Sequence, residues 1–155
     1  MPCREFARLA ALGQRHRTQS TPDGLDRRLG QGLADDAAHV VAIALKRLQA
    51  AGAPSFLTVL KRFGAANQAP LSFPQPGWTL AADVPAGIDG LTEALDELDQ
   101  LVANEGGRLY LAKDSRMHPE MMRKTYPELK AWQATRNSLD PRGVFTSDLA
   151  RRLEL

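Results

Sequence analysis

The sequence lacks the features that define several protein classes. Its one cysteine, Cys3, cannot form an internal disulfide or a cysteine-based zinc site, and a reducing cytoplasm is the expected location. No apolar run approaches the roughly 20 residues that span a bilayer, so we expect no transmembrane segment. Peripheral contact with a membrane stays open.

The sequence also has no large excess of positive or negative charge. The 20 Lys and Arg balance 18 Asp and Glu, and they are dispersed along the chain, which argues against a nucleic-acid partner. The histidines share no ligand spacing, so we predict no metal site. No glycine-rich loop of either familiar spacing is present to hold a dinucleotide by its pyrophosphate.

What is present divides the chain in two. Residues 1–34 are rich in arginine and have no sustained apolar period, so we predict a poorly ordered segment, with a short amphipathic helix through Phe6, Leu9 and Leu12 as the alternative. Residues 35–155 have the composition of one ordered domain, because apolar and turn-forming residues alternate there regularly.

The ordered part begins with a helix that Asp35 or Asp36 can cap and that stops at Gly52. The aromatic and β-branched run at 56–63 predicts a strand. Three prolines in 65–77 forbid a helix and predict a loop.

Strict alternation from Trp78 to Val84 predicts a second strand. Asp89 or Thr92 can cap the next helix, which Gly106–Gly107 closes. Arg108–Lys113 is predicted as a third strand, with Leu109 and Leu111 on one face.

The remaining elements are short helices. Pro119 and Pro127 each mark the start of one, Asp140–Gly143 is a turn, and 148–155 is a final helix or tail. We therefore predict an α+β fold, an antiparallel sheet with helices on one face in a split βαββαβ-like order. That order lacks a clear first strand, so either a strand forms against its propensity or the sheet has an exposed edge.

Three blocks then stand out together, Ser55–Asp83, Gly106–Arg116 and Leu139–Leu155. They resemble the C-terminal domain of FAD-linked oxidases of the vanillyl-alcohol oxidase superfamily, with the strongest likeness to decaprenylphosphoryl-ribose oxidases and a further similarity to aldonolactone oxidases. The resemblance covers residues 35–155 and implies a domain without its FAD-binding half, from a truncated or split protein. FAD is the family's cofactor, and we expect that this chain alone does not bind it.

The resemblance also assigns roles to residues. It places Lys113 as the catalytic cation that faces both flavin and substrate, and Tyr110 as a second flavin contact, where an ordinary sheet tyrosine is the alternative. Lys61 and Phe63 are two apart on one strand and therefore share a face, which the family uses as a substrate wall. The alternative is that Phe63 is core and Lys61 lies along it.

Thr79 and Ala81 occupy the pocket-facing positions of the next strand, where the decaprenylphosphoryl-ribose oxidases carry asparagine and cysteine. The resemblance thus implies a substrate-side domain that binds a sugar, sugar phosphate or aldonolactone whose hydroxyl is oxidised by hydride transfer to flavin. The alternative is a non-catalytic α+β module that self-associates or complements a separate flavin-domain chain through an open sheet edge.

Overall fold

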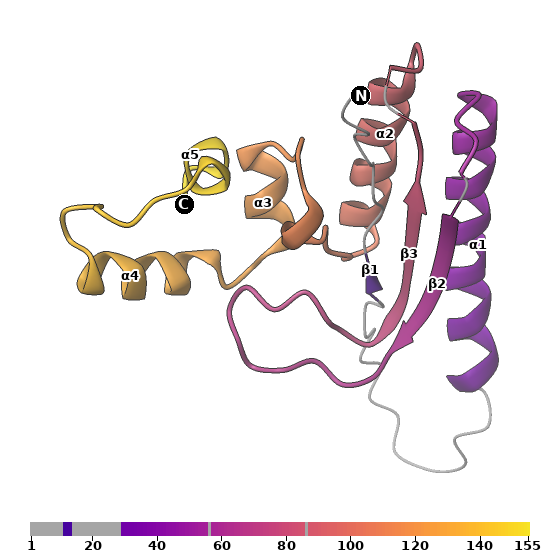
Figure 1. The fold of residues 1–155 in the computed structure, drawn as a ribbon. Helices are drawn as coiled ribbons and strands as arrows, with labels where there is room; N and C mark the ends of the chain where they lie inside the picture. The colour runs from indigo at the N-terminus through magenta and orange to yellow at the C-terminus, as the bar shows by residue number, and fades with distance from the viewer. Residues whose placement is uncertain (1–10, 14–28, 56, 86) are drawn as a thin grey trace, which may run out of the picture.

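The structure is a computed structural model that describes residues 11–13, 29–55, 57–85 and 87–155, with side chains from His39 onward. It confirms the α+β class. Figure 1 shows the elements in chain order: β1 (Ala11–Gly13), α1 (Leu29–Ala50), β2 (Leu57–Phe63), β3 (Gly77–Asp83), α2 (Leu91–Asn104), the 3₁₀ turn η1 (Leu111–Lys113), α3 (Pro119–Thr125), α4 (Leu129–Leu139) and α5 (Asp148–Leu153).

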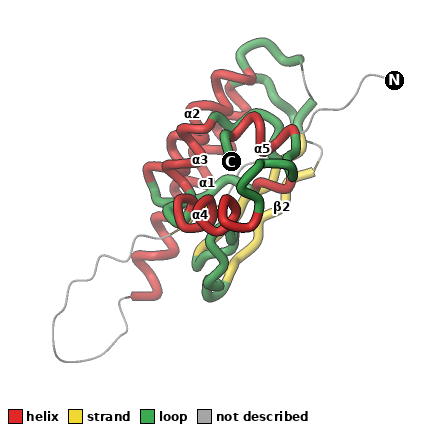
Figure 2. The backbone as a smooth tube through the Cα atoms, turned by 90° about the vertical axis from the view of Figure 1, so that its left-hand side faces the viewer, coloured by secondary structure: helices red, strands yellow, loops and turns green. Residues whose placement is uncertain are grey.

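The sheet is antiparallel with the order β1-β3-β2. β2 and β3 pair along seven residues each, with Lys61 opposite Thr79 and Phe63 opposite Gly77. Figures 1 and 2 show α1 and α2 together on one side of these two strands. β1 and β2 are the two edge strands of the described sheet, and Leu57 and Leu60 of β2 are about half exposed.

The core lies between the two long helices and β3. Apolar side chains at helical spacing in α1 and α2 meet the alternating apolar positions of β3, since each element buries one face. The buried set from these elements is Val40, Ala44, Leu48, Leu80, Ala82, Leu91, Leu95, Leu98, Val102 and Ala103. This leaves the opposite face of the strands free to line a pocket.

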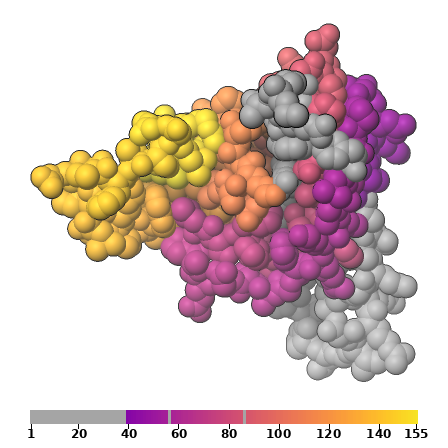
Figure 3. Space-filling model, viewed as in Figure 1, coloured from indigo at the N-terminus to yellow at the C-terminus, as the bar shows by residue number. Residues whose placement is uncertain are grey.

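The C-terminal helices form a lobe that projects from the sheet, as the space-filling view in Figure 3 shows. The buried face of α3, with Met121 and Met122, joins the lobe to the core. Arg123 of α3 and Gln133 of α4 both hydrogen bond to Glu154, which holds the chain end against them. The helices expected after Pro119 and Pro127 and the final helix are confirmed.

Two helix starts differ from the prediction. α1 begins at Leu29, six residues before Asp35, because Leu29 and Leu33 already have the i, i+4 spacing of a helix, so no cap at Asp35 or Asp36 is needed. α2 begins at Leu91 after Gly90, whose φ of 77° supplies the turn that Asp89 or Thr92 was expected to form. Both predicted helix ends, at Gly52 and Gly106, hold: each has a positive φ.

The predicted third strand is wrong. Arg108 is a single bridge residue, and Leu111–Lys113 is a 3₁₀ turn instead. Strand pairing stops here because the Leu109 carbonyl accepts a 2.6 Å hydrogen bond from the buried Tyr126 hydroxyl. The Lys113 N–H then turns back to the Tyr110 carbonyl at 3.2 Å.

A first strand does exist, at a place the pattern did not single out. β1 pairs with β3 through Ala11 opposite Thr79 and Gly13 opposite Gly77, against a weak local strand propensity. Residues 29–34, predicted to be poorly ordered, are helical. Residues 1–10 and 14–28 lie outside the described residues. Phe6 and Leu9 of the alternative amphipathic helix are among them, whereas Leu12 lies in β1 and not in a helix.

Candidate functional site

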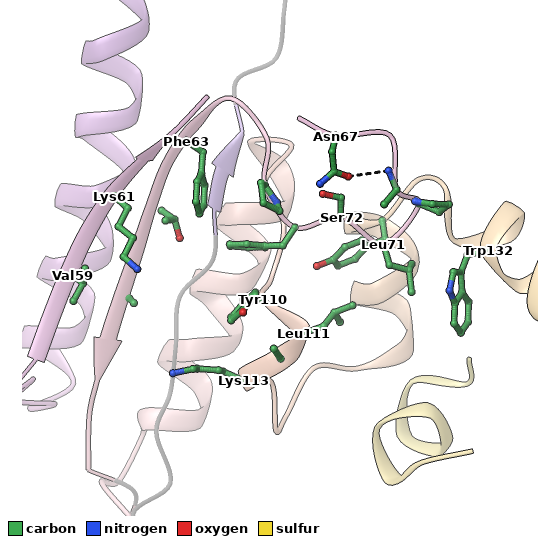
Figure 4. A pocket seen from close by; sticks show the side chains of 18 residues that line it. Val59, Lys61, Phe63, Asn67, Leu71, Ser72, Tyr110, Leu111, Lys113 and Trp132 are labelled. Carbon is green, nitrogen blue, oxygen red and sulfur yellow. Dashed lines mark hydrogen bonds between the residues drawn. The ribbon is translucent and has the colours of Figure 1, made fainter. Parts of the chain in front are cut away.

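A cavity with a volume of about 900 Å³ lies on the face of β2 and β3 opposite the core. Figure 4 shows its walls: the two strands on one side, η1 below, and the 64–76 loop with Trp132 on the other. A cavity of this size exceeds what a single sugar ring fills and is typical of small-molecule sites. It is lined by Val59, Lys61, Phe63, Asn67, Ala69, Pro70, Leu71, Ser72, Phe73, Pro74, Thr79, Ala81, Tyr110, Leu111, Ala112, Lys113, Tyr126 and Trp132.

The strand wall contains the four residues predicted from the sequence to contact substrate. Lys61 pairs with Thr79 across the ladder, and Val59 pairs with Ala81. Since alternate residues of a strand share a face, Lys61, Phe63, Thr79 and Ala81 all line the cavity. Thr79 is buried and contributes a hydroxyl, whereas Ala81 offers only a methyl group.

Tyr110 and Lys113 form the facing wall. A strand would direct residues three apart to opposite faces, but a 3₁₀ turn has three residues per turn and brings them to the same side. Both line the cavity, and both are exposed. Figure 4 shows Lys61 and Lys113 reaching into the space between β3 and η1 from opposite sides. Among the described residues, no carboxylate forms a salt bridge with either ammonium group, so both charges are available to a ligand.

An aromatic cluster joins the two walls. The ring of Phe73, from the loop, meets Phe63 edge to face with centroids 5.8 Å apart and Tyr110 at 4.8 Å. Such contacts add to the burial of the rings and restrain them. The phenol of Tyr110 is therefore positioned by Phe73, while its 40% exposure leaves it open to the cavity.

The 64–76 loop is tied to the segment that leads into η1. The Arg108 guanidinium donates to the Ser72 carbonyl and lies 5.6 Å from the centre of the Tyr126 ring. The Gln75 amide donates to the Gly106 carbonyl at 2.9 Å. Burial raises the pKa of Tyr126, which keeps its hydroxyl protonated as a hydrogen-bond donor.

An ion-pair network holds the turn directly after Lys113. Asp114 accepts from the backbone N–H groups of Arg116 and Met117 at 3.1 and 2.8 Å, and from the Arg152 guanidinium of α5 at 2.8 Å. Arg116 bonds to Asp96 and Asp99 of α2 at 2.5 Å each. Asp114 and Arg116 therefore each form ion pairs, Asp114 with α5 and Arg116 with α2.

Asp99 is the unusual carboxyl of this network. Its burial outweighs the attraction of Arg116 and raises its pKa from 3.8 to about 6. Between pH about 4 and 6 the folded state therefore binds more protons than the unfolded state, and the stability that Asp99 contributes falls as pH rises through this window.

We predict that Asp99→Asn removes this dependence. The difference in free energy of unfolding between wild type and variant should fall by up to about 3 kcal/mol from pH 4 to pH 6 and then stay level, because the shift is about two pKa units. Urea unfolding of both proteins at four pH values from 4 to 7 measures it. A difference that is flat or rises with pH would contradict the assignment.

Several pocket residues were not predicted from the sequence. Phe73, Trp132, Val59 and Ser72 line the cavity but were not among the predicted site residues. Ser72 Oγ is, in the described chain, a buried side-chain oxygen without a hydrogen-bond partner. Phe73 and Ser72 join the site because the 64–76 loop lies close to η1. The local sequence does not encode this proximity.

The metal prediction concerned His16, His39 and His118. His16 lies outside the described residues. Among those described, no cluster of three or more His, Cys, Asp or Glu side chains is arranged to hold an ion. No described helix is long and apolar enough to cross a membrane.

Comparisons with known proteins show that the chain is similar in sequence to oxidases. Residues 89–153 match the D-arabinono-1,4-lactone oxidase family. The chain is 53% identical over 108 residues to decaprenylphosphoryl-β-D-ribose oxidase of Mycolicibacterium smegmatis, which is 70% of this chain and 23% of that protein. It is 46% identical over 127 residues to an uncharacterized protein in the mprA 5′ region of Streptomyces coelicolor, which is 82% of this chain and 34% of the relative.

These matches confirm the resemblance to FAD-linked oxidases over the matched residues. They also show that the chain spans only about a quarter to a third of the length of these curated relatives.

Proposed function

We propose that the chain forms the substrate side of the active site of an FAD-linked oxidase, which oxidises a hydroxyl of a sugar, sugar phosphate or aldonolactone. One observation carries the proposal: all six residues assigned from the resemblance, Lys61, Phe63, Thr79, Ala81, Tyr110 and Lys113, line one cavity. They come from three separate segments, so local sequence alone does not bring them together.

The residues of the cavity are suited to contact the ring system of FAD, but they are not suited to hold its pyrophosphate. Tyr110 offers an exposed aromatic face, and Lys113 offers an ammonium group that no carboxylate of the described residues pairs with, which suits the flat, electron-accepting ring system. No glycine-rich loop is available to take the pyrophosphate. We therefore assign the ring contact to this chain and the hold on the pyrophosphate to another part of the oxidase.

When bound, FAD would accept the hydride from the carbon that bears the hydroxyl, and the hydroxyl proton would pass to the reduced ring or to water in the open cavity. The chain's own residues would orient the substrate and polarise its reacting hydroxyl. Lys113 donates a hydrogen bond to the substrate oxygen or stabilises negative charge that develops at the ring. Lys61 and Thr79, opposite each other in the ladder, bind further hydroxyl or phosphate oxygens, and Phe63 excludes water.

A chimera tests this function. The matched segment of the M. smegmatis oxidase is replaced by the corresponding residues of this chain, and flavin reduction is followed without oxygen after addition of decaprenylphosphoryl-ribose or D-arabinono-1,4-lactone. We expect reduction by at least one of them. A chimera that holds flavin and reduces it with neither would argue against the proposed function.

The isolated chain should carry no flavin. Because it offers a ring contact and no pyrophosphate site, we predict that the purified protein, after incubation with excess FAD and gel filtration, shows no absorbance at ~450 nm. The unmodified M. smegmatis oxidase, treated identically, is the positive control. Flavin that elutes with the chain in a one-to-one ratio would contradict the division of roles.

A further inference from the structure

The hydroxyl of Ser72 differs from the other polar groups of the cavity wall. Ser72 is 7% exposed, and in the described chain its Oγ has no hydrogen-bond partner. A buried hydroxyl that pairs with nothing costs free energy, because folding removes its bonds to water. Native proteins contain few such groups, so each one calls for a physical explanation. Since Ser72 lines the cavity, a ligand group is the partner that its position favours.

The backbone of Ser72 is fixed on both sides. Its N–H donates to the Ala69 carbonyl at 2.9 Å, which closes a four-residue turn with Pro70 in the second position. Proline restricts the backbone at that position and favours such a turn. The Ser72 carbonyl accepts a hydrogen bond from the Arg108 guanidinium. Because both backbone groups are bonded, the hydroxyl moves by rotation about the Cα–Cβ bond, and the turn fixes the positions that it can reach.

Further contacts hold the residues on either side of Ser72. The Ala69 N–H donates to the side-chain oxygen of Asn67 at 2.9 Å, the bond that is dashed in Figure 4. The ring of Phe73, the next residue, packs against Tyr110 of the facing wall. The turn is therefore ordered before any ligand binds, so a ligand that bonds to Ser72 does not have to order it.

The part of the cavity wall around Ser72 carries no charged side chain. Figure 4 shows Ser72 on the far side of the cavity from Lys61. The residues near it in the loop that also line the cavity are mostly apolar: Ala69, Pro70, Leu71, Phe73 and Pro74. Arg108 does not line the cavity, and its guanidinium contacts the Ser72 carbonyl and the Tyr126 ring. A charged ligand group would lose its hydration here without gaining a counter-ion, whereas a neutral oxygen needs only a hydrogen bond.

The cavity is large enough for a substrate to contact Ser72 and the two lysines together. Its volume of about 900 Å³ exceeds what a single sugar ring fills. The proposed function places the reacting hydroxyl at Lys113 and further oxygens at Lys61 and Thr79. The space at Ser72 then receives a part of the substrate that these residues do not bind. A serine hydroxyl both donates and accepts, so a hydroxyl is the group that can use both of its capacities.

Resting on the proposed function, we propose that Ser72 is a substrate-binding residue whose hydroxyl bonds to a second, uncharged hydroxyl of the substrate, distinct from the one that is oxidised. This contact selects for substrates that carry a hydroxyl at that position. A substrate without it leaves the buried Ser72 hydroxyl unpaired in the complex, and this penalty is the source of the selection.

Ser72→Ala in the flavin-loaded chimera of the preceding section tests the contact. The rate of flavin reduction without oxygen is measured against the concentration of decaprenylphosphoryl-ribose or D-arabinono-1,4-lactone, which gives Kd and the limiting rate separately. We expect Ser72→Ala to raise Kd about three- to tenfold, the range of one neutral hydrogen bond, and to leave the limiting rate within about twofold. Ser138→Ala is the matched control: this exposed serine of α4 does not line the cavity, and both values should stay as in wild type.

Urea unfolding of the isolated chain is a second arm, which needs neither flavin nor substrate. Because the hydroxyl is unpaired without a ligand, Ser72→Ala should unfold at the same urea concentration as wild type or at a higher one. A hydroxyl that holds the loop in place would shift the midpoint to lower urea instead. Weaker substrate binding without a loss of stability distinguishes a group kept for a ligand from a structural one.

Monodeoxy analogues of the substrate form a third arm, which identifies the contacted hydroxyl. For the analogue that lacks it, Kd of the wild-type chimera should rise by the same factor by which Ser72→Ala raises Kd of the parent compound. Ser72→Ala should then add no further rise for this analogue, because the two changes remove the same hydrogen bond.

An unchanged Kd in Ser72→Ala, a lower urea midpoint, or strictly additive effects for every analogue would each overturn the proposal. The proposed function fails in a different way, as bound flavin that neither compound reduces. In that case Kd is read from the change in flavin absorbance when the compound binds, which still tests Ser72. A flavin-loaded chimera that binds neither compound would overturn both proposals.

Discussion

Lys113→Met should lower kcat of the flavin-loaded chimera by about 10² to 10³-fold while flavin content stays unchanged. Lys113 stands at the end of η1, exposed to the cavity and, among the described residues, without a salt-bridge partner. A positive charge that acts on the reacting oxygen or on the ring contributes mainly in the transition state, so its loss lowers kcat more than it raises KM. Stopped-flow flavin reduction measures the rate directly.

Lys130→Met is the matched control. Lys130 is an exposed lysine of α4 that does not line the cavity, and its substitution should leave the rate within about twofold, since exposed charges far from the reacting atoms contribute little. Lys113→Arg keeps the positive charge but changes the shape of the group that carries it. This variant should recover only part of the rate, because the guanidinium is a planar fork. A Lys113→Met chimera that reduces flavin as fast as the Lys130→Met chimera would remove Lys113 from the chemistry.

Arg116→Met should lower the free energy of unfolding by about 3 kcal/mol, because it removes the guanidinium that offsets the burial of the Asp99 carboxyl, which must then either take up a proton or stay charged without a partner. The Asp99 side chain is 7% exposed and bonds to Arg116, which also contacts Asp96 and the Leu95 carbonyl. The same guanidinium links α2 to the turn after Lys113. Its loss should therefore also increase amide hydrogen exchange at 113–117.

A second ion pair on α2 supplies the comparison. Arg47 of α1 bonds to Glu97, but their side chains are 43% and 65% exposed, so Arg47→Met should cost less than about 1 kcal/mol. In the Asp99→Asn, Arg116→Met double variant the unpaired charge is gone, and part of the loss should be recovered. Equal losses for Arg47→Met and Arg116→Met in urea unfolding at pH 7 would show that burial of Asp99 does not matter.

The predictions from sequence that held depend on short-range periodicity. Lys61 and Phe63 share a face because a strand repeats every two residues, and the alternation from Trp78 to Val84 identified β3. Arg108–Lys113 was predicted as a strand because its apolar residues also alternate. The prediction failed because the Tyr126 hydroxyl, 17 positions beyond Leu109, donates a hydrogen bond to the Leu109 carbonyl. The sequence of this segment carries no signal of that distant partner.

By itself, the sequence determined the α+β class and the likeness to FAD-linked oxidases, because local periodicity and motif residues are visible along the chain. It also singled out six residues that line one cavity. Only the tertiary structure decided how those residues meet. The 3₁₀ turn brings Tyr110 and Lys113 to the same side, the 64–76 loop adds Phe73 to the wall, and the Asp140 turn presents Val144 and Phe145 to solvent. Each of these three features depends on contacts or backbone geometry that local periodicity does not encode. All three therefore form only when the chain packs.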